Sequence, residues 1–178
     1  MGSASSRLRR SSVALIGSAA AGAGFFLAPT FALRATNTTA FCVSCHSMQF
    51  PLADAAEASH SKNDHGATVG CADCHVPRAL APYLRAKILA ARDVYRELAD
   101  PVLTRADYER VRPEWAARTR AKFLADDSAA CRHCHQFESF SSPIKAHERA
   151  LAQGTTCIVC HYNLVHGETP WPEMEREL

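Results

Sequence analysis

Apolar and charged positions divide the chain into an N-terminal segment of membrane type and a larger mixed region. After the basic residues Arg7, Arg9 and Arg10, residues 13–33 form a run of 21 residues without a charged side chain. A helix of that length, rising about 1.5 Å per residue, would cross a hydrocarbon core of about 30 Å. Basic residues before the run favour a single-pass anchor with its N-terminus in the cytoplasm. We therefore expect residues 1–34 to anchor the chain in a bacterial inner membrane.

A cleaved signal peptide is the alternative interpretation of this segment. Residues 30–32 (Thr-Phe-Ala) offer small side chains where cleavage could occur, and the run is rich in alanine and glycine. Small residues also recur four positions apart, at Ser18 and Gly22 and at Ala20 and Gly24. This spacing lets membrane helices approach closely, so the segment is compatible with a homo-oligomer.

Further along the chain, apolar residues recur at steps of three and four, which predicts a helix with one apolar face. That face comprises Leu80, Leu84, Ile88, Ala91, Tyr95 and Leu98. The pair Asp100-Pro101 should end this helix, and a second helix is predicted from Pro113 to about Ala125. Because strand signals are absent from the sequence, the predicted class is mainly α.

All eight cysteines belong to four copies of the pattern Cys-x-x-Cys-His. The copies are Cys42, Cys45 and His46; Cys71, Cys74 and His75; Cys131, Cys134 and His135; and Cys157, Cys160 and His161. Two thiols at this spacing can form thioethers to one haem, and the histidine that follows can bind its iron as the proximal ligand. The pattern predicts four covalent c-type haems, numbered below in motif order. Four disulfides or two zinc sites would use the cysteines but would not explain the histidine after every pair.

The region after the anchor is small for so many cofactors. Residues 35–178 provide 144 residues, or 36 for each haem, and so short a chain cannot build a large apolar core. We expect one compact periplasmic domain with little regular structure, in which porphyrins supply most of the buried surface. The formal charge of +2 omits the haem propionates, so it indicates no nucleic-acid role.

Motif spacing predicts that this domain is built as two di-haem modules. The first two motifs begin 29 residues apart and the last two 26 apart, whereas 60 residues separate the second from the third. Each short interval contains a histidine in a matching place, His60 in one and His147 in the other. The modules would span about 35–78 and 126–168, with a helical connector at about 79–125.

Five histidines lie outside the proximal positions, and three of them are predicted to bind iron from the distal side. His60 and His147 have matching positions, and His147 shares a helical face with Ile144 and Leu151. His166 follows His161 by five residues, about 140° round a helix, so it should serve a neighbouring haem. The remaining two, His65 and His133, are predicted to lie on the surface. One iron therefore lacks a distal histidine.

The first haem is the one expected to differ. Met48 follows His46 by two residues, too close to reach the opposite face of the same haem. It either replaces His46 as the iron ligand on the same side or is a core methionine.

These motifs together resemble the NapC/NirT/NrfH family of membrane-anchored tetrahaem c-type cytochromes, which includes CymA-like quinol dehydrogenases. The resemblance covers nearly the whole chain. The resemblance rests on the following segments: the anchor, CVSCHSM at 42–48, the pattern His60-x-x-Asn63-x-x-Gly66 before CADCHVP at 71–77, KILAARDVY at 87–95, and GTTCIVCH at 154–161 followed by His166.

The resemblance implies that electrons pass from membrane quinol, either menaquinol or ubiquinol, to a periplasmic redox enzyme such as a nitrate, nitrite or N- or S-oxide reductase. It also implies a quinol site at the first haem, with a lysine and an acid that map to Lys87 and Asp93. Oxidation of quinol releases protons, so a carboxylate and a lysine suit the reaction. Six residues apart on a helix, they would lie about 120° apart and flank a cleft. Without the resemblance, they are two charges on an arginine-rich helix.

Other functions remain open at this level. A periplasmic electron carrier or haem sensor would need no quinone chemistry, and a terminal reductase is a third, weaker alternative. The reverse reaction would feed electrons from a periplasmic dehydrogenase into quinone. The sequence does not give the direction of electron flow, because haem potentials depend on the ligands and surroundings of each iron. Some relatives carry a histidine three residues after the second proximal histidine, where this chain has Arg78.

Overall fold

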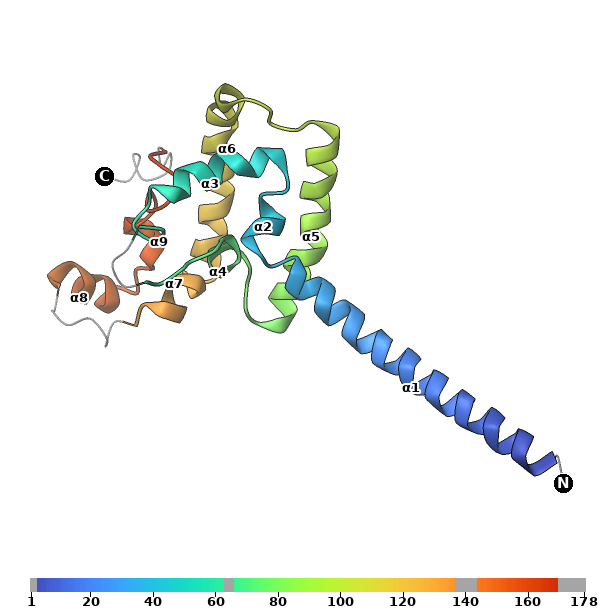
Figure 1. Cartoon of the computed structure of the whole chain (residues 1–178). Coiled ribbons are helices and arrows are strands. Elements are labelled where there is room, and N and C mark those ends of the chain that lie inside the picture. Colours follow the sequence, from blue (N-terminus) through green and yellow to red (C-terminus); the bar gives the residue numbers. More distant parts are fainter. Residues whose placement is uncertain (1–2, 63–65, 137–143, 170–178) are drawn as a thin grey trace. The chain divides into compact units, whose positions relative to one another are not determined.

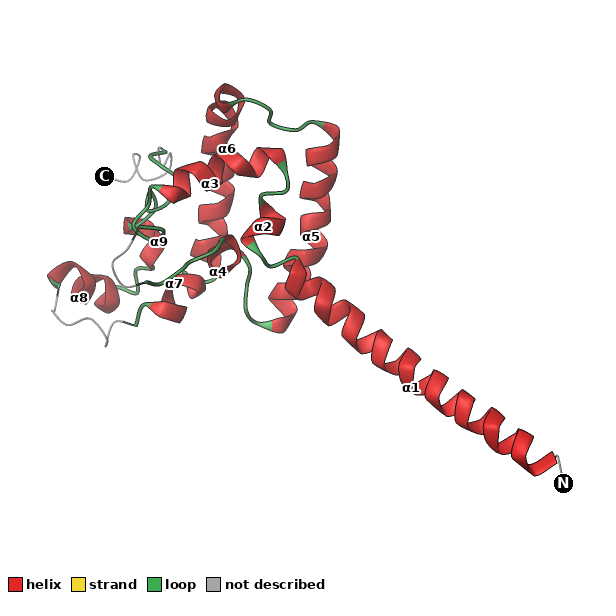
Figure 2. Cartoon of the chain, viewed as in Figure 1, coloured by secondary structure: helices red, strands yellow, loops and turns green. Residues whose placement is uncertain are grey.

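The computed structural model describes residues 3–62, 66–136 and 144–169, and every regular element in these ranges is a helix (Figures 1 and 2). The mainly α class predicted from the sequence is therefore confirmed. His65, expected at the surface, lies outside the described residues. The chain forms two compact units, residues 1–38 and residues 39–178, which are described separately.

The first unit is the long helix α1 (Ser3–Ala35). Its stretch Leu15–Ala35 is long and apolar enough, by length and composition, to cross a membrane. The helix continues through Pro29, and the next residue, Thr30, donates its hydroxyl hydrogen bonds to the carbonyls of Phe26 and Leu27. A hydroxyl satisfied within its own helix can enter an apolar environment at little cost. This unit therefore has the properties expected of the anchor.

The second unit combines two long helices with several short ones (Figure 1). The long helices are α5 (Leu80–Ala99) and α6 (Arg105–Ala125). The short elements are α2 (Thr39–Cys42), η1 (His46–Met48), α3 (Gln49–Ala56), α4 (Cys71–His75), α7 (Ala129–Cys134), α8 (Lys145–Ala152) and α9 (Cys157–Cys160).

Helix α5 has the bounds that the apolar periodicity and the Asp100-Pro101 stop predict. Its apolar face is exposed in this structure: Leu80 keeps 73% of its surface, Ile88 74% and Leu98 81%. The periodicity identified the helix correctly, although it did not identify a surface buried by protein.

Helix α6 begins at Arg105, eight residues before the predicted start at Pro113. The N-cap is Thr104, whose side-chain oxygen accepts a hydrogen bond from the Asp107 backbone N–H at 3.1 Å. This cap satisfies one of the free N–H groups in the first turn. The predicted start is wrong because Pro113 lies inside the helix and not at its beginning.

The protein atoms bury little apolar surface. Among the described residues, Tyr108 is the one large apolar side chain classed as buried, and it is 2% exposed. The other buried residues are polar: Ser47, Arg120, Ser128 and Thr169. Such a core agrees with the expectation that porphyrins supply most of the apolar contacts.

Candidate haem-binding site

The four Cys-x-x-Cys-His motifs lie on or beside short helices, and all eight cysteines are free thiols. The disulfide alternative is therefore absent from this structure. Nor do three or more metal-binding side chains gather into a metal site anywhere in the described ranges. The zinc alternative gains no support there.

Cysteines of consecutive motifs lie close to one another. Burial raises the pKa of the Cys42 thiol, and the nearby Cys71 thiol raises it further. Burial likewise raises the pKa of Cys131 to about 11, with added effects from Cys157 and Cys74. Helix α4 contacts both α2 and α7. The attachment points therefore follow one another in the order of the motifs.

A hydroxyl group joins the two motifs of each module at the same relative position. In the first module, Thr39 Oγ1 accepts a hydrogen bond from the Cys71 backbone N–H at 3.3 Å. In the second, Ser128 Oγ accepts one from the Ile158 N–H at 3.2 Å and lies 2.7 Å from Thr156 Oγ1. Thr39 and Ser128 each precede the first cysteine of their module by three residues. The two contacts are similar but shifted by one residue, because Cys71 is the first cysteine of its motif whereas Ile158 follows the first cysteine of its own.

Three of the proximal histidines each face one of the predicted distal histidines. The ring centres of His75 and His166 lie 5.9 Å apart, those of His60 and His135 6.0 Å apart, and those of His147 and His161 6.1 Å apart.

These distances suit histidines that bind one iron from opposite sides. An imidazole nitrogen binds a transition metal at about 2 Å, so two opposed rings would have their centres about 6 Å apart. Every motif also has two free thiols for the thioethers. The residues present therefore fit covalent c-type haems, three of them with paired histidines.

The pairs join the two modules. His60 lies before the second motif but faces the histidine of the third, and His166 follows the fourth motif but faces the histidine of the second. Only His147, among these three, faces a histidine of its own module. His133, between the cysteines of the third motif, is exposed, as the sequence analysis expected.

The His166 ring is fixed on its other side by the backbone. Its Nδ1 lies 3.0 Å from the carbonyl oxygen of Pro51, and because a carbonyl can only accept, Nδ1 carries the proton. This leaves Nε2 directed to a metal, and histidines that bind metals usually make such a second hydrogen bond. Burial lowers the pKa of His166, which favours the neutral ring that metals require.

The first motif is arranged differently. His46 Nε2 lies 3.1 Å from the carbonyl oxygen of Leu103, so this nitrogen donates a hydrogen bond to the carbonyl in the structure. The next residue, Ser47, is buried: its Oγ accepts from the Val102 N–H at 2.8 Å, and its own N–H donates to Glu97 Oε1 at 3.1 Å. Sequence reasoning missed the roles of Ser47 and Glu97. Ser47 lies in the motif at 42–48, but nothing in that motif indicates its contacts with residues 97 and 102, and Glu97 belongs to no recognisable motif.

Lys87 of α5 lies beside the first motif. It is close enough to Cys42 to lower that thiol's pKa, in opposition to the larger effect of burial. Its Nζ is 5.5 Å from the ring centre of Tyr83, one turn earlier, a residue that the sequence analysis did not select. Asp93 lies six residues further along α5 and is exposed.

Comparison with known proteins places these features in context. Residues 5–172 match the family model described as NapC/NirT cytochrome c family, N-terminal region. A tetraheme cytochrome-c type protein of Allochromatium vinosum is 39% identical over 84% of each chain. The cytochrome c-type protein TorY of Escherichia coli O157:H7 is 39% identical over 82% of this chain but only 42% of its own length.

A solved structure is also similar, with a TM-score of 0.51 at 25% identity, covering 92% of this chain and 97% of the other. It is described as the crystal structure of the cytochrome c nitrite reductase NrfHA complex bound to the HQNO inhibitor.

Proposed function

Because this chain belongs to the NapC/NirT cytochrome c family, whose members are membrane-anchored tetrahaem proteins that transfer electrons to periplasmic reductases, we propose that it oxidises membrane quinol and passes the electrons to a periplasmic terminal reductase. The observation that carries this proposal is the environment of the first motif. There the histidine nitrogen is bonded to the Leu103 carbonyl, and Lys87 lies beside the attachment cysteine Cys42. The other three motifs have the paired histidines typical of electron transfer.

Each haem would be held by residues already in place. His75 and His166 would bind haem 2, His60 and His135 haem 3, and His147 and His161 haem 4. Met48, the residue before α3, would bind the iron of haem 1 in place of His46. The haems, when bound, supply one-electron transfer, and the residues round each iron set its potential.

Lys87 and Asp93 would handle the quinol itself. An ammonium beside the first motif can hold a quinol oxygen by a hydrogen bond and stabilise negative charge as its proton leaves. Asp93, exposed on the same helix, would accept a proton and release it to solvent. The contact between Lys87 and Tyr83 limits the positions that the ammonium can take.

The order of the motifs supports a route from the membrane to a partner. Cys42 adjoins Cys71, and Cys131 adjoins both Cys74 and Cys157. Electrons received at haem 1 would therefore move through haems 2 and 3 to haem 4. We place the N-terminus in the cytoplasm and the haem domain in the periplasm, in agreement with the basic residues before the apolar run.

The partner is proposed as a reductase for nitrate, nitrite or an N- or S-oxide. The similar NrfHA structure is of a nitrite reductase complex, which supports a partner of this kind. The match to TorY covers less than half of that protein's length.

Stopped-flow reduction of the purified holoprotein by a menaquinol analogue tests the proposal. Asp93→Asn removes the proton acceptor and Lys87→Met removes the charged donor, and each should slow haem reduction by about 100-fold or more. Arg92→Met on the same helix and Glu114→Gln on α6 are the matched controls, and both should stay within about twofold of the wild type. HQNO, the inhibitor in the similar structure, should also slow the wild-type reaction.

Unchanged rates in both site variants would leave Lys87 and Asp93 as ordinary surface charges. If quinol fails to reduce even the wild type, the quinol oxidation proposal is wrong. A protein that is first reduced with dithionite, then freed of excess dithionite, and whose haems are then oxidised by added quinone would support the reverse direction. A protein that reacts with neither quinol nor quinone would support the plain carrier.

A further inference from the structure

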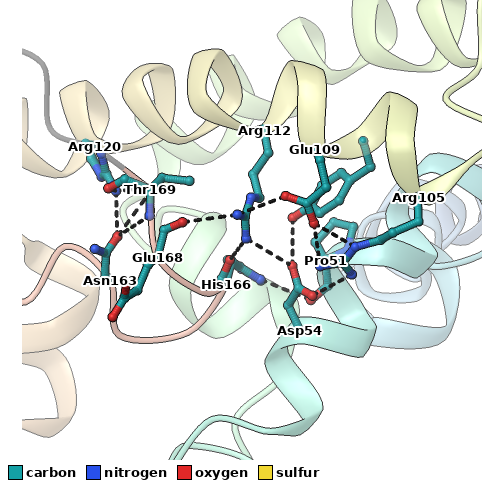
Figure 3. Close-up of polar contacts among 11 residues, drawn as sticks. Pro51, Asp54, Arg105, Glu109, Arg112, Arg120, Asn163, His166, Glu168 and Thr169 are labelled. Carbon is teal, nitrogen blue, oxygen red and sulfur yellow. Dashed lines mark hydrogen bonds and ion pairs between the residues drawn. The ribbon is translucent and has the colours of Figure 1, made fainter.

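Two arginines of α6 hold the segment that carries His166, residues 163–169, here called the His166 loop (Figure 3). At one end, Arg120 donates to Asn163 Oδ1 at 2.9 Å and to the Thr169 carbonyl at 3.1 Å, and it also bonds the Thr169 hydroxyl. Asn163 Oδ1 in turn accepts from the Thr169 N–H at 3.0 Å. These bonds close the two ends of the loop together against α6.

Arg112 holds the middle of the loop. Its Nη1 donates to the His166 carbonyl and its Nη2 to the Glu168 carbonyl, each at 3.1 Å. The guanidinium is largely buried, with 19% of the side chain exposed, and it is neutralised by Glu109 at 2.9 Å and Asp54 at 3.9 Å. A planar group with two parallel donors fixes the backbone on either side of Gly167 more firmly than one bond would.

The same arginine is linked to the acceptor of the His166 ring. Asp54 lies on α3 three residues after Pro51, whose carbonyl accepts from His166 Nδ1 at 3.0 Å. Asp54 also accepts from Arg105 at 2.7 Å and from the Tyr108 hydroxyl at 3.1 Å, so α3 is held against α6. His166 is therefore fixed through its backbone by Arg112 and through its ring by α3.

Gly167 lets Arg112 approach this closely. Its φ is +72°, and a Cβ built at that position would lie 2.8 Å from Arg112 Nη1. A larger residue would have to strain the backbone and displace the guanidinium.

We propose that Arg112 is a positioning residue that holds His166 Nε2 toward His75. The inference rests on the proposed function, in which these two histidines bind haem 2. In this assignment Arg112 acts through its hydrogen bonds to the His166 and Glu168 carbonyls. Loss of its two hydrogen bonds should free the loop and weaken the distal bond, and this would change the spin state of one haem.

EPR of the oxidised, full-length tetrahaem protein tests the proposal. His166→Ala is the reference and should convert one low-spin haem to high spin. Arg112→Met should give the same new high-spin signal, with an intensity up to that of the reference. Arg112→Lys should give a smaller signal, because the ammonium can still donate to one carbonyl but cannot reproduce the planar fork. Added imidazole should remove the new signal in both His166→Ala and Arg112→Met. Arg110→Met, on the same helix with its side chain 74% exposed, is the matched control and should match the wild type.

A double variant separates an effect through His166 from a general one. If Arg112 acts through this histidine, Arg112→Met should add nothing to the high-spin signal of His166→Ala. Gly167→Ala disturbs the same contact from the loop side and should reproduce the Arg112→Met spectrum. If the pyridine haemochrome assay shows that Arg112→Met does not carry four haems, Gly167→Ala and Arg112→Lys test the same contact in its place.

The outcomes distinguish this inference from the ligand assignment. If His166→Ala shows the new signal while the Arg112 and Gly167 variants stay low-spin, the positioning role is wrong and the assignment stands. If His166→Ala itself is unchanged, the assignment fails and the positioning role fails with it. A signal that adds to that of His166→Ala in the double variant also overturns the positioning role.

Discussion

The rings of His60 and His135 lie 6.0 Å apart at an interplanar angle of 85°, although 75 residues separate them in the sequence. One belongs to the first di-haem module and the other to the third motif, in the second module. A haem bound between them would be attached to one module and ligated by the other. If the His75–His166 pair holds a haem in the same way, the two predicted modules would depend on each other.

Replacement of His60 should therefore affect the third haem and not the first or second haem, whose motifs are nearer to His60 in the sequence. We expect His60→Ala to keep four haems by the pyridine haemochrome assay and to convert one low-spin haem to high spin in the EPR spectrum. His133→Ala, at an exposed position beside the same proximal histidine, is the control and should leave the spectrum unchanged. An unaltered spectrum in His60→Ala would remove this residue from the ligands.

The first haem should respond to Met48. Because the first iron lacks a distal histidine, we expect this haem to be open on one side and to give a high-spin EPR component in the wild type. If Met48 binds that iron, Met48→Leu should change the g values of this component and leave the low-spin signals as they are. His46 is bonded to the Leu103 carbonyl and would have to break that bond to take over. Met174→Leu provides a control at a methionine outside the motifs. A wild type with no high-spin component would contradict the open first haem, and an unchanged signal in Met48→Leu would leave His46 as the ligand.

Ser128 should contribute measurably to the stability of the second module. It is fully buried, and its Oγ bonds the Ile158 N–H and the Thr156 hydroxyl. Ser128→Ala leaves these groups without that partner, at a cost of about 1–3 kcal/mol. For a unit of this size the melting temperature should fall by about 2–4 °C per kcal/mol.

Differential scanning calorimetry of the holoprotein measures this loss. Ser44→Ala, at an exposed position in the first motif, is the control and should melt close to the wild type. A Ser128→Ala melting temperature equal to that of Ser44→Ala would mean that the shared hydroxyl does not stabilise the module.

The apolar helix should remain in the mature protein as an anchor. Intact-mass analysis should find residues 1–35 present, and the protein should be recovered with membranes and resist extraction by salt. Protease added to spheroplasts should reach the haem domain, because the basic N-terminal flank favours a periplasmic location. A mature protein that begins near residue 33 and is free in the periplasm would instead support the cleaved signal peptide.

The sequence was most informative where chemistry depends on local spacing. Thiols three positions apart, followed by histidine, identify haem attachment without knowledge of the fold, and an apolar period identifies α5. The start of α6 was missed because Pro113 satisfies the rule for a first turn, while the Thr104 cap that begins the helix was overlooked. Thr39 and Ser128 could have been found, since each precedes the first cysteine of its module by three residues.

The partners of the histidines could not be predicted in the same way. His60 and His147 occupy matching places in the repeat, yet His147 faces a histidine of its own module and His60 faces one of the other. Pairing depends on how the modules pack, which no local spacing encodes. The same holds for Arg112, whose acceptors lie more than fifty residues away and are backbone carbonyls.

The His75–His166 pair bears on the order in which the protein can be assembled. If the haem domain crosses the membrane from its N-terminal end, behind an anchor whose own N-terminus stays in the cytoplasm, His75 reaches the haem attachment machinery before His166, which lies 91 residues later. Haem 2 would then be attached with its distal side open. Its distal ligand, His166, would arrive only after the fourth motif has crossed the membrane. Haem 2 would therefore gain its second histidine only when the rest of the domain has been translocated.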